Sequence, residues 1–170
     1  MIEKPIYRYR MLDAGKLCKL FRNPGIHIPS GDGRTPIQEI VEFIHGAVRS
    51  NYFYIIGRDP RYEAFIYSAA HNFTTYNAHY AIREDKRDNL LKRMAESAKW
   101  VFTHTPCQSI MALVREENRQ GRALLPRVGM RRVGQLTKSV TFNGELVDEI
   151  IYQATAEEFN KVWGEELGGV

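Results

Sequence analysis

Two clusters of basic residues are the first feature of this 170-residue chain whose residue types could do chemistry. One runs from Arg83 to Arg93 and the other from Arg127 to Arg132, in a chain with 24 Lys+Arg against 20 Asp+Glu. Such side chains can hold an anionic small molecule, although a solvated face is the default interpretation of each cluster. Because the positive charge is mild and mixed along the chain, nucleic-acid binding is not indicated.

Other reactive residue types form no catalytic or metal-binding pattern in the sequence. Cys18 and Cys107 lack Cys-x-x-Cys spacing, which argues against a zinc site or a disulfide scaffold and favours two free thiols. His45 stands beside an apolar helical stripe, where a structural role is favoured over a catalytic one. No Ser-His-Asp or paired-carboxylate arrangement can be assembled from the spacing.

Length and composition predict a single domain over residues 1–170. The chain is 44% hydrophobic and 26% charged, as is ordinary for a globular protein, and its apolar runs are too short to span a bilayer. The N-terminus, Met1–Arg10, lacks the apolar segment of a secretory signal. We therefore expect a cytoplasmic protein that does not enter a membrane.

Hydrophobic periodicity predicts a mixed α/β domain. Apolar residues recur at helical spacing after Asp13, after Pro36 and from Leu90 to Phe102. Ile26–Thr35 is rich in Gly, Pro and Ser and is predicted to be a loop. The predicted strands are Ile6–Leu12, Tyr52–Arg58, Glu63–Ala70, Phe73–Arg83, Ser109–Val114, Met130–Phe142 and Glu145–Ala154.

The second half of the chain predicts a strand, a short helix and a hairpin, in that order. Asn118 is a good cap for the helix, Gly129 ends it, and Pro126 is expected to disturb it because proline lacks an N–H. Asn143-Gly144 is a strong hairpin signal, since both residues accept the positive φ of a type I′ turn. A short final helix is expected near Ala156–Trp163.

This order of elements resembles the GNAT fold of the acyl-CoA-dependent N-acetyltransferases. The match is best between Cys107 and Thr155, and it implies one GNAT-like α/β (α+β) domain, with flanking helices on a mixed central sheet of about seven strands. The residues that carry the match to the branch of ribosomal-protein N-terminal acetyltransferases are Asn118, Gly121, Leu124, Leu125, Gly129-Met130, Gly134, Asn143-Gly144, Asp148 and Glu157-Glu158-Phe159.

The resemblance implies that an amine of a protein or small molecule attacks acetyl-CoA held where the fourth and fifth strands splay apart. Such a reaction needs a general base. In the family it often comes from these strands, which makes His79, with Tyr76 and Asn77 nearby, the best catalytic candidate, and His71 and Glu63 lesser ones. A structural role is nevertheless favoured for His79 over a catalytic one. The implied cofactor-binding residues are Ile82, Arg83, Lys86, Arg87, Asp88, Asn89 and Asn118.

Three departures from the family pattern favour an alternative function. Arg83–Asn89 contains no glycine, where the family uses small residues to bring backbone amides close to the CoA pyrophosphate. Leu125 replaces the tyrosine acid of many members, and Gly121 replaces the serine of the closest branch. The chain also resembles small GNAT-like proteins of tailed bacteriophages. The alternative is a catalytically lapsed binding or assembly protein, located in the host cytoplasm or the virion, with phage structural proteins as partners.

Overall fold

The computed structural model describes the backbone of residues 7–8, 36, 39, 42, 53–57, 64–82 and 90–170, and the side chains of residues 36, 39, 42, 70–80 and 90–170. Several predicted features lie outside these residues: Cys18, His45, Glu63, the helix after Asp13, the loop Ile26–Thr35 and the segment Arg83–Asn89. In the helix predicted after Pro36, Glu39 and Glu42 are helical and exposed, as expected for positions off its apolar stripe.

The described elements occur in the predicted order. Each predicted strand has a counterpart, and the final helix extends beyond Trp163 to Leu167. The elements are β1 (Tyr7–Arg8), β2 (Phe53–Gly57), β3 (Ala64–Ala70), β4 (Thr75–Ile82), α3 (Leu90–His104), β5 (Ser109–Arg115), α4 (Arg119–Leu124), the 3₁₀ helix η3 (Leu125–Val128), β6 (Arg131–Phe142), β7 (Glu145–Thr155) and α5 (Ala156–Leu167).

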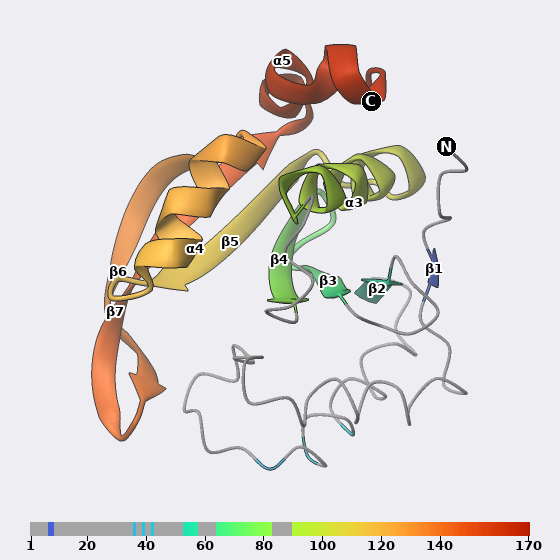
Figure 1. Ribbon diagram of the computed structural model, residues 1–170. Coiled ribbons are helices and arrows are strands. Elements are labelled where there is room, and N and C mark those ends of the chain that lie inside the picture. Colours follow the sequence, from blue (N-terminus) through green and yellow to red (C-terminus); the bar gives the residue numbers. More distant parts are fainter. Residues whose placement is uncertain are drawn as a thin grey trace.

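The strands form one seven-stranded sheet in the order β1-β2-β3-β4-β5-β7-β6 (Figure 1). All neighbouring strands run antiparallel except β4 and β5, which run parallel. A mixed sheet with flanking helices confirms the predicted fold class. In the part of the chain that the structure describes, no helix has the length and apolar character needed to cross a bilayer.

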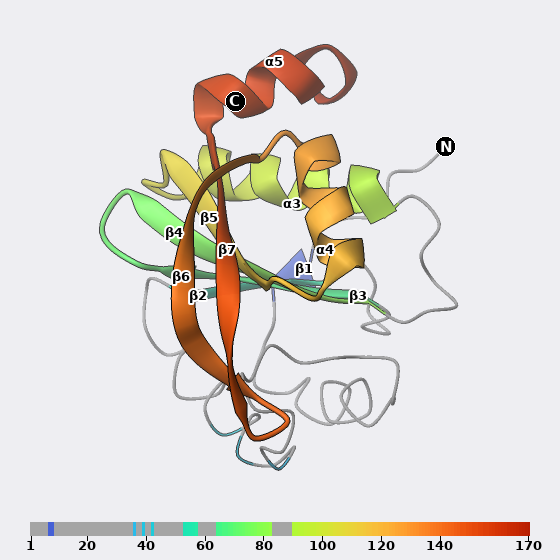
Figure 2. The same ribbon diagram turned by 90° about the vertical axis from the view of Figure 1, so that its left-hand side faces the viewer.

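Helices α3 and α4 cover the same face of this sheet (Figure 2). Successive strand residues point to opposite faces, so every second residue of β4, β5 and β7 faces these helices. Tyr76 and Met94 are the largest fully buried side chains of this core, and burial of a large apolar side chain stabilises the fold by about 1.5–3 kcal/mol. The buried core residues on this face are Tyr76, Ala78, Met94, Val101, Cys107, Ile110, Ala112, Leu125, Val128, Met130, Ile150, Tyr152 and Ala154.

The segment after Asn118 is shortened by its proline, as predicted. The α-helical part ends at Leu124, and residues Leu125–Val128 continue as a 3₁₀ helix with Pro126 in its first turn. Proline has no N–H to donate to the α-helical ladder. Gly129 then ends the helix with φ at 96°, a left-handed conformation that favours glycine.

The β6–β7 hairpin turns at Asn143 and Gly144, whose φ angles are 53° and 90°. Both are positive, and the flanking Phe142 and Glu145 are paired, which confirms the predicted hairpin. Two register shifts interrupt β6, one between Arg132 and Gly134 and one between Leu136 and Val140. Such irregularities bend a strand and increase its twist.

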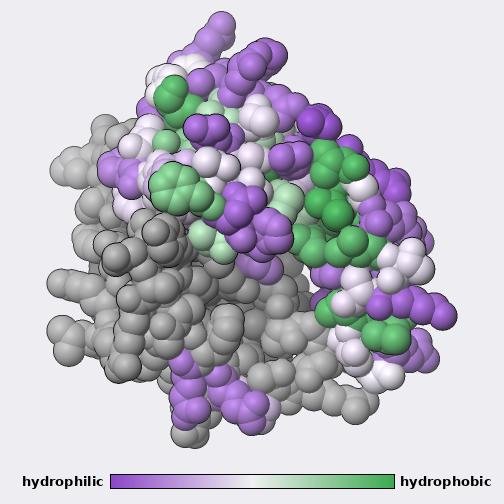
Figure 3. All heavy atoms as spheres, turned by 180° about the vertical axis from the view of Figure 1, so that it is seen from behind, coloured by the Kyte–Doolittle hydropathy of each residue, from purple (hydrophilic) through white to green (hydrophobic). Residues whose placement is uncertain are grey.

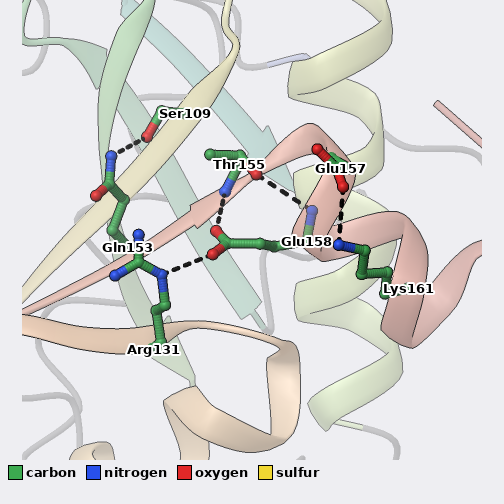
Figure 4. A network of polar contacts seen from close by, with 7 residues as sticks. All are labelled: Ser109, Arg131, Gln153, Thr155, Glu157, Glu158 and Lys161. Atoms are coloured by element: carbon green, nitrogen blue, oxygen red, sulfur yellow. Dashed lines mark hydrogen bonds and ion pairs between the residues drawn. The ribbon is translucent and has the colours of Figure 1, made fainter.

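Helix α5 is attached to the sheet by a chain of polar contacts (Figure 4). Thr155 and Glu158 form a reciprocal capping box at its start. Arg131 Nε donates to Glu158 Oε1 at 2.6 Å, and Gln153 Nε2 donates to Ser109 Oγ at 2.6 Å. The Ser109–Gln153 contact joins β5 to β7, and the Arg131–Glu158 contact joins β6 to α5.

Candidate functional site

The parallel strands β4 and β5 separate part of the way along their length. They form three residue pairs, Thr75–Ser109, Tyr76–Ile110 and Asn77–Met111. Beyond the last pair, β4 continues to Ile82 beside β3, and β5 continues to Arg115 beside β7. Because both strands are described over their whole length, their facing edges do not pair with each other from Ala78 and Ala112 onward. The backbone N–H and C=O groups along these edges can bind a ligand.

His79 lies on β4, two residues beyond the last pair with β5. Burial lowers the pKa of His79 to about 4, so its imidazole is neutral at pH 7. A neutral imidazole has a ring nitrogen that can accept a proton, and its low pKa makes it a weak base. The position of His79 beside the opening is the one predicted for a general base, and its catalytic role stays a prediction.

Tyr76 and His79 do not lie together. They are three positions apart on one strand, so their side chains point to opposite faces of the sheet. Tyr76 is 0% exposed and packs in the core beneath α3, which favours a packing role, while Asn77 shares the face of His79. His71, the lesser candidate, is exposed in the β3–β4 turn, before β4 begins and away from the opening.

The packing of α4 and η3 leaves little room for the serine and tyrosine that the family carries at positions 121 and 125. Asn118 Oδ1 accepts a hydrogen bond from Gly121 N at 2.9 Å, so Asn118 caps the helix, and its Nδ2 can still donate. A β-carbon on Gly121 would stand 3.1 Å from Val114 Cγ1, which leaves little room for a serine. Leu125 is 2% exposed and fills the core at the tyrosine position.

Most of the predicted cofactor-binding residues fall between β4 and α3. Ile82 is the last residue of β4, and Leu90 is the first residue of α3. Arg83, Lys86, Arg87, Asp88 and Asn89 connect them and are outside the described residues. Their roles therefore stay predictions, as does that of Ile82.

A hollow between α4 and β7 was not predicted from the sequence. It has a volume of about 380 Å³ and is lined by Arg119, Arg122, Ala123 and Tyr152. The available signal was the spacing of Arg119 and Arg122, because residues three apart on a helix share a face. The basic cluster predicted from the sequence, Arg127–Arg132, lies in the neighbouring segment.

Comparison with known proteins gives one family and a fold. Residues 62–165, more than half of the chain, match the family described as "Protein of unknown function (DUF2824)". No curated protein matches the sequence.

Two solved structures illustrate the similarity of fold. RimJ from Mycobacterium smegmatis, in complex with CoA-disulfide, is 20% identical with a TM-score of 0.70, and the alignment covers 90% of this chain and 82% of that one. A chimaeric spermidine N-acetyltransferase SpeG from Vibrio cholerae is 13% identical with a TM-score of 0.74, covering 91% and 96%. At these identities the similarity establishes the fold, which is that of the GNAT acetyltransferases.

Proposed function

The chain belongs to the DUF2824 family of proteins of unknown function, and we propose that it is an N-acetyltransferase that transfers the acetyl group of acetyl-CoA to an amine of a protein or small molecule. The observation that carries this proposal is the separation of β4 from β5 after the pair Asn77–Met111. Two proteins of the same fold support the proposal: one is a spermidine N-acetyltransferase, and another is in complex with CoA-disulfide.

The open strand edges fit the acyl-carrying arm of acetyl-CoA. That arm contains amide groups, and the β5-facing edge of Ala78–Ile82 offers N–H donors and C=O acceptors outside the β4–β5 ladder. Asn118 Nδ2 would add a donor at the start of α4. Lys86 and Arg87, in the connection from β4 to α3, would supply positive charge for the pyrophosphate in place of the family's glycines.

His79 would take the proton from the attacking amine. When bound, acetyl-CoA supplies a thioester carbonyl that an uncharged amine can attack. A ring nitrogen of the neutral imidazole would accept the proton that the ammonium must lose. Asn77, on the same face of β4, would help to orient the amine. No residue of α4 or η3 is assigned as a proton donor, because Gly121 and Leu125, which stand at the family's serine and tyrosine positions, carry no titratable group.

Calorimetric titration of the full chain with acetyl-CoA tests the proposal. We expect saturable binding of one equivalent, with a Kd below about 1 mM. An assay for the released CoA thiol would then identify the acceptor among polyamines and peptides with free N-termini. Absence of binding at about 1 mM acetyl-CoA would exclude the enzymatic function.

A second candidate function is that of a catalytically lapsed assembly protein of a bacteriophage virion. It is favoured by Gly121 of α4 and Leu125 of η3, which replace polar groups of the family, and by apolar side chains exposed on the β6–β7 hairpin. Figure 3 shows hydrophobic residues gathered on that side of the molecule. Leu136 and Leu146 are 40% and 59% exposed, and they lie on opposite faces of the hairpin because Leu136 pairs with Glu149, three positions from Leu146. Exposed apolar patches often mark protein-binding surfaces. Co-purification with phage structural proteins, without acetyl-CoA binding, would select this candidate.

A further inference from the structure

We infer that the hollow between α4 and β7 is a second binding site, for a small phosphate-bearing molecule. Arg119, Arg122 and Ala123 contribute one wall from α4, and Tyr152 contributes the other from β7. A volume of about 380 Å³ lies within the range of small-molecule sites. The inference does not depend on acetyltransferase activity.

The two arginines of α4 place positive charge on the same side of the helix. Arg122 Nη1 donates to the backbone oxygen of Glu116 at 2.7 Å, which fixes the guanidinium and leaves its other N–H groups for a ligand. Arg119 makes no ion pair with any carboxylate among the residues for which side chains are described. The pair therefore carries charge that an anion can neutralise.

A third guanidinium, on β6, lies on the same face of the sheet but does not line the hollow. Arg132 is paired with Tyr152, so its side chain lies on the face that carries Tyr152 and α4. Its Nη2 donates to Gln135 Oε1 at 2.8 Å. Asp148, an acidic residue of this face, accepts hydrogen bonds from Gln135 Nε2 and Lys138 N, both at 2.8 Å, so both its oxygens are already engaged.

The rest of the lining indicates the kind of molecule that fits. Tyr152 is 6% exposed and forms, with Ala123, an apolar surface next to the arginines. Guanidinium groups bind phosphate oxygens in a bidentate manner, and an aromatic ring suits a flat or apolar portion of a ligand. A phosphomonoester or pyrophosphate on a small molecule combines these features within the available volume.

The hollow and the β4–β5 opening are formed by different residues. Leu125 and Val128 point into the core that contains Met94 and Val101 of α3, whereas Arg119 and Arg122 line the side toward β7. A ligand in the hollow would therefore contact residues other than the facing edges of β4 and β5.

Titration of the ¹⁵N-labelled full chain with inorganic pyrophosphate, followed by NMR at low salt, tests this inference. We expect saturable shifts of the amides of Arg119, Arg122, Ala123 and Tyr152. The double substitution Arg119→Gln and Arg122→Gln should weaken binding about tenfold or more, because two charge-assisted contacts are lost. Arg127→Gln is the matched control, since it removes one charge from the adjacent exposed segment without lining the hollow.

Arg119→Gln alone keeps the test available if the double variant does not fold. Arg119 is exposed, and its one non-helical hydrogen bond, from its backbone N–H to Glu117 O at 2.8 Å, does not depend on the side chain. A loss of affinity of about threefold or more is then expected. Shifts confined to residues 83–89, or equal affinity in the variants and the natural chain, would overturn the inference. A chain that binds pyrophosphate in the hollow but does not bind acetyl-CoA would uphold it while excluding the acetyltransferase proposal.

Discussion

Gly121 of α4 and Val114 of β5 are in such close contact that a β-carbon on Gly121 would stand 3.1 Å from Val114 Cγ1. The same atom would stand 3.1 Å from Nδ2 of the capping residue Asn118. The glycine thus lets the helix pack directly on the strand that borders the β4–β5 opening. Packing, rather than chemistry alone, explains why a serine is absent here.

Gly121→Ala should destabilise the protein, although glycine is a poor helix former. The substitution gains about 0.5–1 kcal/mol of helix propensity, but overpacking against Val114 costs about 1–3 kcal/mol, so we expect a net loss of about 1 kcal/mol. Gly164→Ala in α5 is the control, because its nearest contact would be an ordinary 3.8 Å and the same propensity gain should stabilise. Urea unfolding measures both; stabilisation by Gly121→Ala would contradict the expectation.

Stability at acid pH should depend on Glu158. The backbone N–H of Thr155 and the Arg131 guanidinium lower the pKa of this carboxyl below its usual 4.5 in the folded chain. Its contribution to stability is therefore complete above the unfolded pKa and is lost as the pH falls through the lower, folded value. Glu158→Gln should flatten the fall of the urea midpoint between about pH 6 and pH 3.

The control for Glu158 is Glu165→Gln, at an exposed glutamate near the end of the same helix. This variant should keep the acid dependence of the natural chain. If the urea midpoint of Glu158→Gln falls between about pH 6 and pH 3 as much as that of the natural chain, the contact between Arg131 and Glu158 does not contribute to folding.

Because of His79, the free energy of unfolding should decrease as the pH is lowered from about 6.5 to about 4. Burial lowers its folded pKa to about 4, whereas the unfolded value is 6.5, so the unfolded chain binds a proton in this window that the folded chain does not. The resulting stability is complete above pH 6.5 and is lost as the pH falls toward 4. Replacement by Asn removes this dependence, and urea midpoints measured at pH 7.5 and pH 5 should then differ less than in the natural chain.

Catalysis is expected to require the same side chain. His79→Asn should lower kcat for an amine acceptor by about 100-fold through loss of the base, with the Kd of acetyl-CoA unchanged. His104→Asn, at an exposed histidine of α3, should leave kcat as it is. A variant that loses acetyl-CoA binding together with kcat would instead assign His79 a structural role.

The sequence predicts the order of elements because its periodicities and breakers are local signals. Pro126 shortens α4, and Asn143-Gly144 forms the hairpin turn, each through its own backbone preferences. The opposite orientations of Tyr76 and His79 also follow from strand alternation, which is a local signal as well.

Contacts between distant parts of the chain could not be predicted in this way. Arg131 and Glu158 are 27 positions apart, and their ion pair depends on how α5 leaves the sheet. The hollow beside Tyr152 likewise requires α4 to lie across β7, which no local pattern specifies. Tertiary packing brought these residues together.

Hydrogen–deuterium exchange of the full chain with and without acetyl-CoA tests most directly whether the β4–β5 opening is the cofactor site. Protection should increase in peptides that cover Ala78–Ile82 and Ala112–Arg115, whose facing edges are not paired with each other. The paired segments of β6 and β7 serve as internal controls and should not change. Slower exchange at Ala78–Ile82 is the predicted result, and acetyl-CoA binding without any change there would contradict it.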